Sequence, residues 1–126
     1  MDPGRTLIII SSTDLFGMQR IQEDLTTAGY SVTVIQTNEA PSAICNQDPV
    51  LIIVNLSDNS ASDMALCQEL SRISDAPIVA IGSSADEGFR ANILSTVVDD
   101  FLVRPVNPLE LTARVKNILR RAQNPR

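Results

Sequence analysis

The chain contains no histidine and no tryptophan, and it has a single tyrosine, Tyr30. Without histidine the commonest general base is missing, which excludes a histidine-based catalytic triad. The two cysteines, Cys45 and Cys67, form no CxxC motif, so a structural zinc site is not expected either. We interpret both as reduced packing residues of a cytoplasmic protein, with a redox switch as the alternative. Since aromatic residues make up only 3% of the chain, the core must be aliphatic.

Long apolar segments are also lacking. No run approaches the roughly 20 residues that a membrane-spanning helix requires. The charged start leads directly into a short apolar segment, which does not resemble a secretory signal. We therefore expect a cytoplasmic protein without a membrane partner. A formal net charge of −5 disfavours direct nucleic-acid binding by this domain, because phosphates would be repelled.

Four short apolar runs organise the sequence: TLIIIS, VLIIVN, PIVAIG and DDFLVRP. Strands that are apolar on both faces are typical of a parallel sheet covered by helices on either side. Ligands bind such sheets beyond the carboxyl ends of the strands. The residues expected to meet there are Ser11, Ser12, Asn55, Gly82 and Arg104. Two hydroxyls, an amide and a cation, without a carboxylate, disfavour a metal site, and we expect no cofactor.

Helical periodicity fills the intervals between the strand patterns. Strands are predicted over 6–11, 31–35, 50–55, 77–82 and 100–103, and helices over 14–28, 38–46, 63–73, 86–95 and 107–122. Asn107 is predicted to cap the last helix, with Pro108 in its first position and Glu110 in a capping box. The pattern predicts an α/β fold: a three-layer sandwich around a five-stranded parallel sheet of order 2-1-3-4-5. Residues 6–122 form the domain, 1–5 a flexible tail, and 123–126 a tail that would link to an output domain.

The segment VDDFLVRPVNPLELTARVKNILRR, residues 98–121, resembles the end of receiver domains of bacterial response regulators, in particular the OmpR/PhoB subgroup. DPVLIIVNLSDNSASDMALCQEL and DAPIVAIGSSAD fit the family's third and fourth strands with their loops, so the resemblance covers nearly the whole chain. It implies a CheY-like, or flavodoxin-like, fold.

The resemblance also assigns roles to positions. Asn55 stands where the family carries its phosphoacceptor aspartate, and Ser11 and Ser12 stand where it carries the acidic pair that helps to hold magnesium. The switch hydroxyl corresponds to Gly82, with Ser83 one place on, and the phosphate-binding lysine corresponds to Arg104. These positions form a degenerate phosphoacceptor pocket.

Two further features follow from the resemblance. Phe101 occupies the switch-aromatic position, and we expect it to point inward because Gly82 has no side chain to block it. The Arg104–Pro105 bond is expected to be cis. Asp14 and Asp58 are the nearest acids that could substitute as phosphorylation sites, but we interpret Asp14 as a helix cap and Asp58 as a solvated loop residue.

In the OmpR/PhoB subgroup, receivers pair through the fourth helix, fifth strand and fifth helix. The matching charges are Arg90, Asp99, Asp100, Glu110, Arg114 and Lys116. The expected pairs across a two-fold axis are Arg90–Glu110, Asp100–Arg114 and Asp99–Lys116. The alternative is a mixed-sign solvated surface, which many soluble domains carry, and such a dimer also needs an apolar patch.

These observations predict a non-enzymatic, phosphorylation-independent receiver domain of a bacterial signalling or transcription regulator, acting through homodimerisation or docking of a partner protein. Two alternatives remain. The emptied pocket could sense an anion at Ser11, Ser12, Ser83 and Arg104. The segment SSTDLFG is faintly similar to the phosphate loop of flavodoxins, although the aromatic residues needed for flavin stacking are scarce.

Overall fold

The computed structural model describes residues 6–11, 15–57, 61–83 and 87–123. At its centre is a parallel five-stranded sheet in the order β2-β1-β3-β4-β5. The strands are β1 (Thr6–Ser11), β2 (Ser31–Ile35), β3 (Leu51–Asn55), β4 (Ile78–Gly82) and β5 (Asp100–Val103). The predicted strand order is confirmed.

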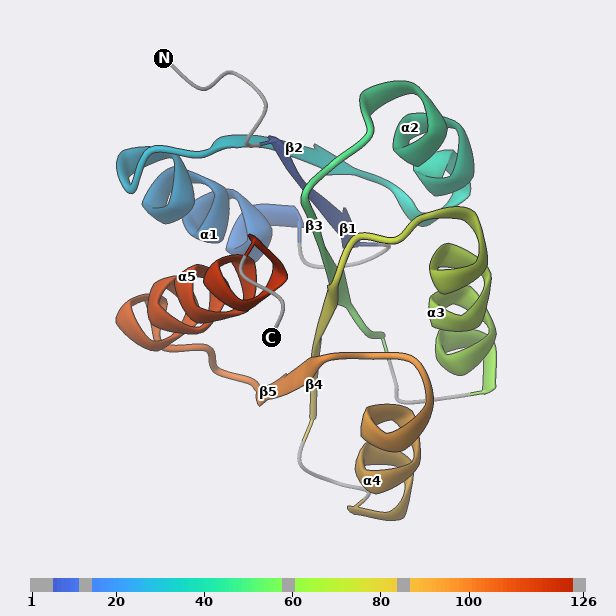
Figure 1. The fold of residues 1–126 in the computed structure, drawn as a ribbon. Helices are drawn as coiled ribbons and strands as arrows, with labels where there is room; N and C mark the ends of the chain where they lie inside the picture. Colours follow the sequence, from blue (N-terminus) through green and yellow to red (C-terminus); the bar gives the residue numbers. More distant parts are fainter. Residues whose placement is uncertain (1–5, 12–14, 58–60, 84–86, 124–126) are drawn as a thin grey trace.

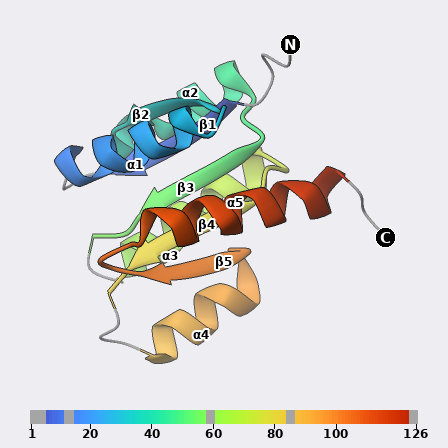
Figure 2. The same ribbon diagram turned by 90° about the vertical axis from the view of Figure 1, so that its left-hand side faces the viewer.

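Helices cover both faces of the sheet, which makes three layers. They are α1 (Leu15–Thr27), α2 (Ala40–Gln47) preceded by a 3-10 turn η1 (Thr37–Glu39), α3 (Ala61–Ile73), α4 (Glu87–Thr96) and α5 (Pro108–Gln123). Figures 1 and 2 show α1 and α5 side by side on one face, whereas α2, α3 and α4 lie on the other. In the part of the chain that the structure describes, no helix combines the length and apolarity needed to cross a bilayer.

Two apolar clusters hold the layers together, and the alternation of side chains along each strand separates them. Leu7 and Ile9 of β1 face α1 and α5, while Ile8 and Ile10 face α2 and α3, and all four are fully buried. Because β1, β3 and β4 are buried on both faces, these strands read as continuous apolar runs.

The start of α5 follows the predicted cap. The Asn107 Oδ1 accepts hydrogen bonds from the backbone N–H groups of Leu109 (2.8 Å) and Glu110 (3.2 Å). Pro108 is the first helical residue. The Glu110 carboxylate is bonded to Arg114 one turn later instead of completing a capping box. Arg114 is bonded to Asp100 of β5 as well.

The two cysteines differ in environment: Cys45 is exposed and Cys67 is buried in the α3 side of the core. Burial, and secondarily the charge of Asp63, raises the pKa of the Cys67 thiol to about 12. At pH 8 we expect an alkylating reagent to modify Cys45 fully, while the thiolate fraction of Cys67 stays at about 10⁻⁴. Because the folded pKa lies above the unfolded value of 9.0, this burial stabilises the fold fully below pH 9 and less as pH rises toward 12. Mass spectrometry after timed alkylation checks the expectation, and equal labelling of both thiols would contradict it.

Candidate functional site

Four of the five residues predicted to share one crevice lie at the carboxyl edge of the sheet. Ser11, Asn55 and Gly82 end β1, β3 and β4, and Arg104 follows β5 directly. Ser11 and Asn55 are register partners in neighbouring strands, and the Arg104 N–H donates to the Gly82 carbonyl (2.8 Å). Ser12 lies outside the described residues, as do Asp14 and Asp58.

A chain of hydrogen bonds fills the middle of this edge. Asn55 Nδ2 donates to Ser11 Oγ (3.1 Å), and Asn55 Oδ1 accepts from Arg104 Nη1 (2.9 Å). The same guanidinium nitrogen lies 2.9 Å from the Leu56 carbonyl oxygen and 3.4 Å from that of Ile81. The ends of β1, β3 and β5 are therefore tied together by neutral groups around one cation. We call Ser11, Asn55 and Arg104 the strand-end network.

This network does not fit a divalent cation. Magnesium binds hard oxygen ligands, mainly carboxylates, and the network offers a hydroxyl and an amide. The amide oxygen already accepts a hydrogen bond from the Arg104 guanidinium. A cation on that oxygen would be repelled, by roughly 4 kcal/mol for two unit charges 4 Å apart near a protein surface. Among the described residues, no group of three or more His, Cys, Asp or Glu side chains could hold a metal ion.

One buried acid near this edge escaped the sequence analysis. Asp63, in the first turn of α3, is only 7% exposed, and its Oδ1 lies 3.4 Å from both the backbone N and the Oγ of Ser57. Asp63 thereby links the start of α3 to Ser57, in the loop after β3. The available signal was an acid in the first turn of a predicted helix, where the helix dipole favours negative charge.

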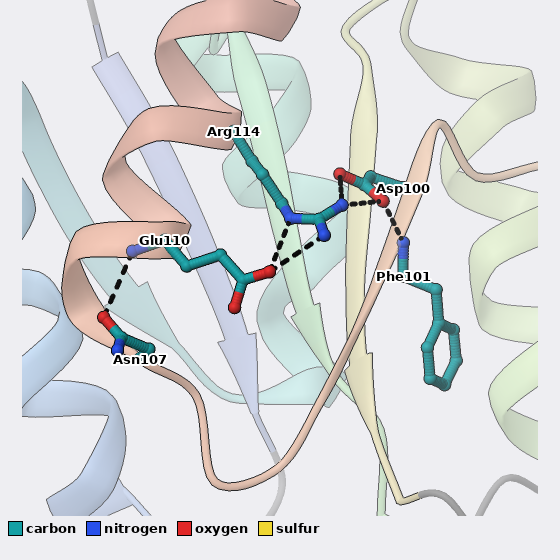
Figure 3. Close-up of polar contacts among 5 residues, drawn as sticks. All are labelled: Asp100, Phe101, Asn107, Glu110 and Arg114. Atoms are coloured by element: carbon teal, nitrogen blue, oxygen red, sulfur yellow. Dashed lines mark hydrogen bonds and ion pairs between the residues drawn. The ribbon is translucent and has the colours of Figure 1, made fainter.

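A second polar cluster joins β5 to α5 (Figure 3). Arg114 Nη1 donates to both carboxylate oxygens of Asp100, at 2.9 and 2.8 Å. Its Nε and Nη2 donate to Glu110 Oε2, at 3.2 and 2.9 Å. These bonds, first to Asp100 and then to Glu110, raise the pKa of the Arg114 guanidinium. The Asp100–Arg114 pair, expected between two copies, is thus formed within one chain.

No protein-family model matches the chain. Several curated proteins are nevertheless similar to it in sequence. The probable transcriptional regulator ycf27 of Cyanophora paradoxa is 33% identical over 119 residues, which cover 93% of this chain and 50% of the relative. The transcriptional regulatory protein BaeR of Escherichia coli O6:H1 is 32% identical over 118 residues, covering 93% of this chain and 49% of that protein. The chain spans about half the length of the curated relatives it matches.

Solved structures show the same similarity over whole chains. A two-component response regulator from Clostridium difficile superposes with a TM-score of 0.82 at 28% identity, covering 93% of this chain and 98% of that one. The receiver domain of the TMAO respiratory system response regulator TorR gives a TM-score of 0.82 at 26% identity, covering 92% and 98%. The chain is a response-regulator receiver domain. It is a signalling domain and not an enzyme.

Phe101, which we expected to be the switch aromatic, is 4% exposed and packs in the cluster with α3 and α4. The ring points away from Asp100, as Figure 3 shows. The Arg90 guanidinium carbon lies 5.7 Å from the ring centroid, so a cation from α4 covers the aromatic face. The Arg104–Pro105 bond that follows β5 is cis, as predicted.

The remaining charges of the receiver's predicted dimer face lie in different places. Asp99 Oδ2 accepts from the Ile78 N–H (2.8 Å) and lines a hollow of about 350 Å³ with Arg121. Lys116 instead lines a groove with α1, beside Leu109 and Ala113. Side chains two positions apart on a helix point in directions about 200° apart, so Arg114 and Lys116 cannot lie on the same side of α5. Among the described residues that line the hollow with Asp99, the cation from α5 is Arg121 and not Lys116.

Proposed function

We propose that this receiver domain works without phosphorylation, as part of a bacterial transcription regulator in the cytoplasm, through homodimerisation or partner docking on α4, β5 and α5. The ycf27 and BaeR relatives are described as transcriptional regulators and are about twice as long as this chain. An output domain joined to this receiver would account for the difference. The proposed face carries Arg90, Asp99, Asp100, Glu110 and Arg114, with Lys116 at its margin.

The observation that carries the proposal is the bond from Arg104 to Asn55 at the position of the family's phosphoacceptor. An amide is a poor nucleophile toward a phosphoryl group, and here its oxygen is already occupied by a guanidinium. Ser11 supplies a neutral hydroxyl where the family supplies an acid. Neither the nucleophile nor the magnesium ligands are therefore in place.

The buried position of the expected switch aromatic, Phe101, also supports a receiver that works without phosphorylation. Phe101 lies inward, and Gly82 presents no side chain that would oppose it. The covering Arg90 contributes roughly 0.5–1 kcal/mol if it behaves like other exposed cation–π pairs. A receiver held this way would present one constant output face.

The charges of that face are balanced, with Arg90 and Arg114 set against acids of β5 and α5. The Asp100–Arg114 pair is already satisfied within one chain, so exchanging it across a two-fold axis would add little affinity. Glu110 also pairs with Arg114, but its carboxylate is more exposed than that of Asp100, at 51% against 22%. Glu110 is therefore the acid that we expect Arg90 of a second copy to reach, and we expect this contact to decide association. Leu94, one turn beyond Arg90 and 40% exposed, supplies apolar surface on the same side of α4.

A mixing experiment tests this interface. Arg90→Glu and Glu110→Lys should each make the receiver monomeric, because a two-fold dimer would then hold two like-charge contacts. An equimolar mixture should dimerise again, since both contacts become attractive in the heterodimer. Sedimentation velocity over a concentration series measures all three samples.

The matched control exchanges charges on α3, with Arg72→Glu and Glu69→Lys, and should leave association unchanged. A wild-type chain that stays monomeric at every concentration refutes homodimerisation of this domain. A wild-type dimer that survives both single variants shows that the contact lies elsewhere.

A further inference from the structure

A groove of about 460 Å³ runs between α1 and the turn that leads from β5 into α5. Figures 1 and 2 show α1 and α5 side by side there, above the same face of the sheet. The apolar lining comes from Met18, Ile21, Ile81, Pro105, Val106 and Pro108. The volume of the groove lies within the range of small-molecule sites, roughly 300–1,000 Å³.

Arg104 brings a fixed cation to this lining. Its Nη1 is anchored by the Asn55 Oδ1 and the Leu56 carbonyl. Within the described part of the chain, its Nε and Nη2 donate to no protein group, and no carboxylate pairs with it. The guanidinium is half-buried, so the open donors border a partly enclosed, partly apolar space. Such donors on a pre-oriented guanidinium suit an anion.

A second cation, Arg20, lines the same groove from α1. Asp24 is the one acid among the described lining residues, so these residues carry a formal charge of +1 (two arginines less one aspartate). The whole chain, by contrast, carries −5. The charge of this groove is therefore opposite in sign to the net charge of the chain.

We propose that this groove binds a small amphiphilic organic anion, an organic acid with an apolar body. The acid head would take the open donors of Arg104, and the body would lie against Met18, Ile21 and Val106. Inorganic anions fit less well because they leave the apolar walls uncovered. This site shares Arg104 with the anion site expected from the sequence, but it lies toward α1 and away from Ser11 and Ser83. It holds whether or not the domain dimerises.

The test uses 8-anilinonaphthalene-1-sulfonate, a fluorescent amphiphilic anion, with N-phenyl-1-naphthylamine as its uncharged analogue. We expect saturable binding of the sulfonate to the folded wild-type chain and much weaker binding of the amine. Arg104→Gln should weaken sulfonate binding about tenfold or more, the usual loss for a charged hydrogen bond. Arg20→Gln should weaken it about threefold, as expected for an exposed charge. Octanoate should displace the probe, whereas octanol and inorganic phosphate should not.

The matched control is Arg72→Gln, an exposed arginine of α3 on the other face of the sheet, which should bind like the wild type. Amide chemical-shift changes in the wild type should gather on the first half of α1 and around Val106. If Arg104→Gln fails to fold, the affinity of Arg20→Gln and the chemical-shift changes of the wild type still test the proposal. Equal affinity in wild type and Arg20→Gln, together with shifts on α4 or α2, would overturn the proposal, as would equal binding of the uncharged analogue.

Discussion

Replacing Arg104 with methionine should lower the free energy of unfolding by about 3 kcal/mol. The substitution keeps an apolar stem of similar length and removes only the guanidinium. Asn55 Oδ1 and the Leu56 carbonyl would then lose their donor, and both residues are nearly inaccessible to water, at 4% and 1% exposure. A buried acceptor without a partner costs about 1–3 kcal/mol. Urea unfolding followed by circular dichroism measures the change.

Two further variants give this expectation its controls. Arg104→Lys keeps a positive charge and one donor group but not the planar fork, so its loss should fall between wild type and Arg104→Met. Arg72→Met removes an exposed arginine of α3 and should change stability by less than about 0.5 kcal/mol. A loss in Arg104→Met no larger than that of Arg72→Met would show that the strand-end network contributes little.

Much of the fold could be predicted because each strand carries its own signal. The bounds of β1, β2 and β5 agree with the predicted ranges, since each apolar run ends there at a polar residue. The region before β3 was less predictable. The predicted helix over 38–46 is divided into η1 and α2, with Pro41 near the start of α2 and Asp48 in a left-handed conformation (φ 48°) at its end. Periodicity alone does not encode such local turns.

The membership of the pocket was also predictable, because parallel strands end at one edge of the sheet. The direction of each side chain was not. Arg104 could have faced solvent, and its turn toward Asn55 depends on packing between residues 49 positions apart. The same holds for the Asp100–Arg114 pair, which the family pattern suggested between copies and which the packing of α5 on β5 forms inside one. Arg20 was missed because nothing in the sequence places α1 beside the turn after β5.

Restoring the family's charges should restore its chemistry. We expect the quadruple variant Ser11→Asp/Ser12→Asp/Asn55→Asp/Arg104→Lys to gain one covalent phosphoryl group from acetyl phosphate in the presence of magnesium. The fold already places positions 11, 55 and 104 at one edge, with Ser11 and Asn55 in register. Carboxylates there would supply the hard oxygen ligands that are missing, and the lysine would remove the guanidinium fork from position 55. Intact-protein mass spectrometry measures the gain.

Wild type and Asn55→Asp alone should remain unmodified under the same conditions. In the single variant the new carboxylate would pair with Arg104, which donates to that position at 2.9 Å in the wild type, and Ser11 would still be neutral. Magnesium should raise the melting temperature of the quadruple variant only, because it alone gathers carboxylates that repel one another without the ion. Labelling of the wild type at position 55 would refute phosphorylation independence. Labelling of Asn55→Asp alone would show instead that the amide, and not the loss of the acidic pair, is what silences this receiver.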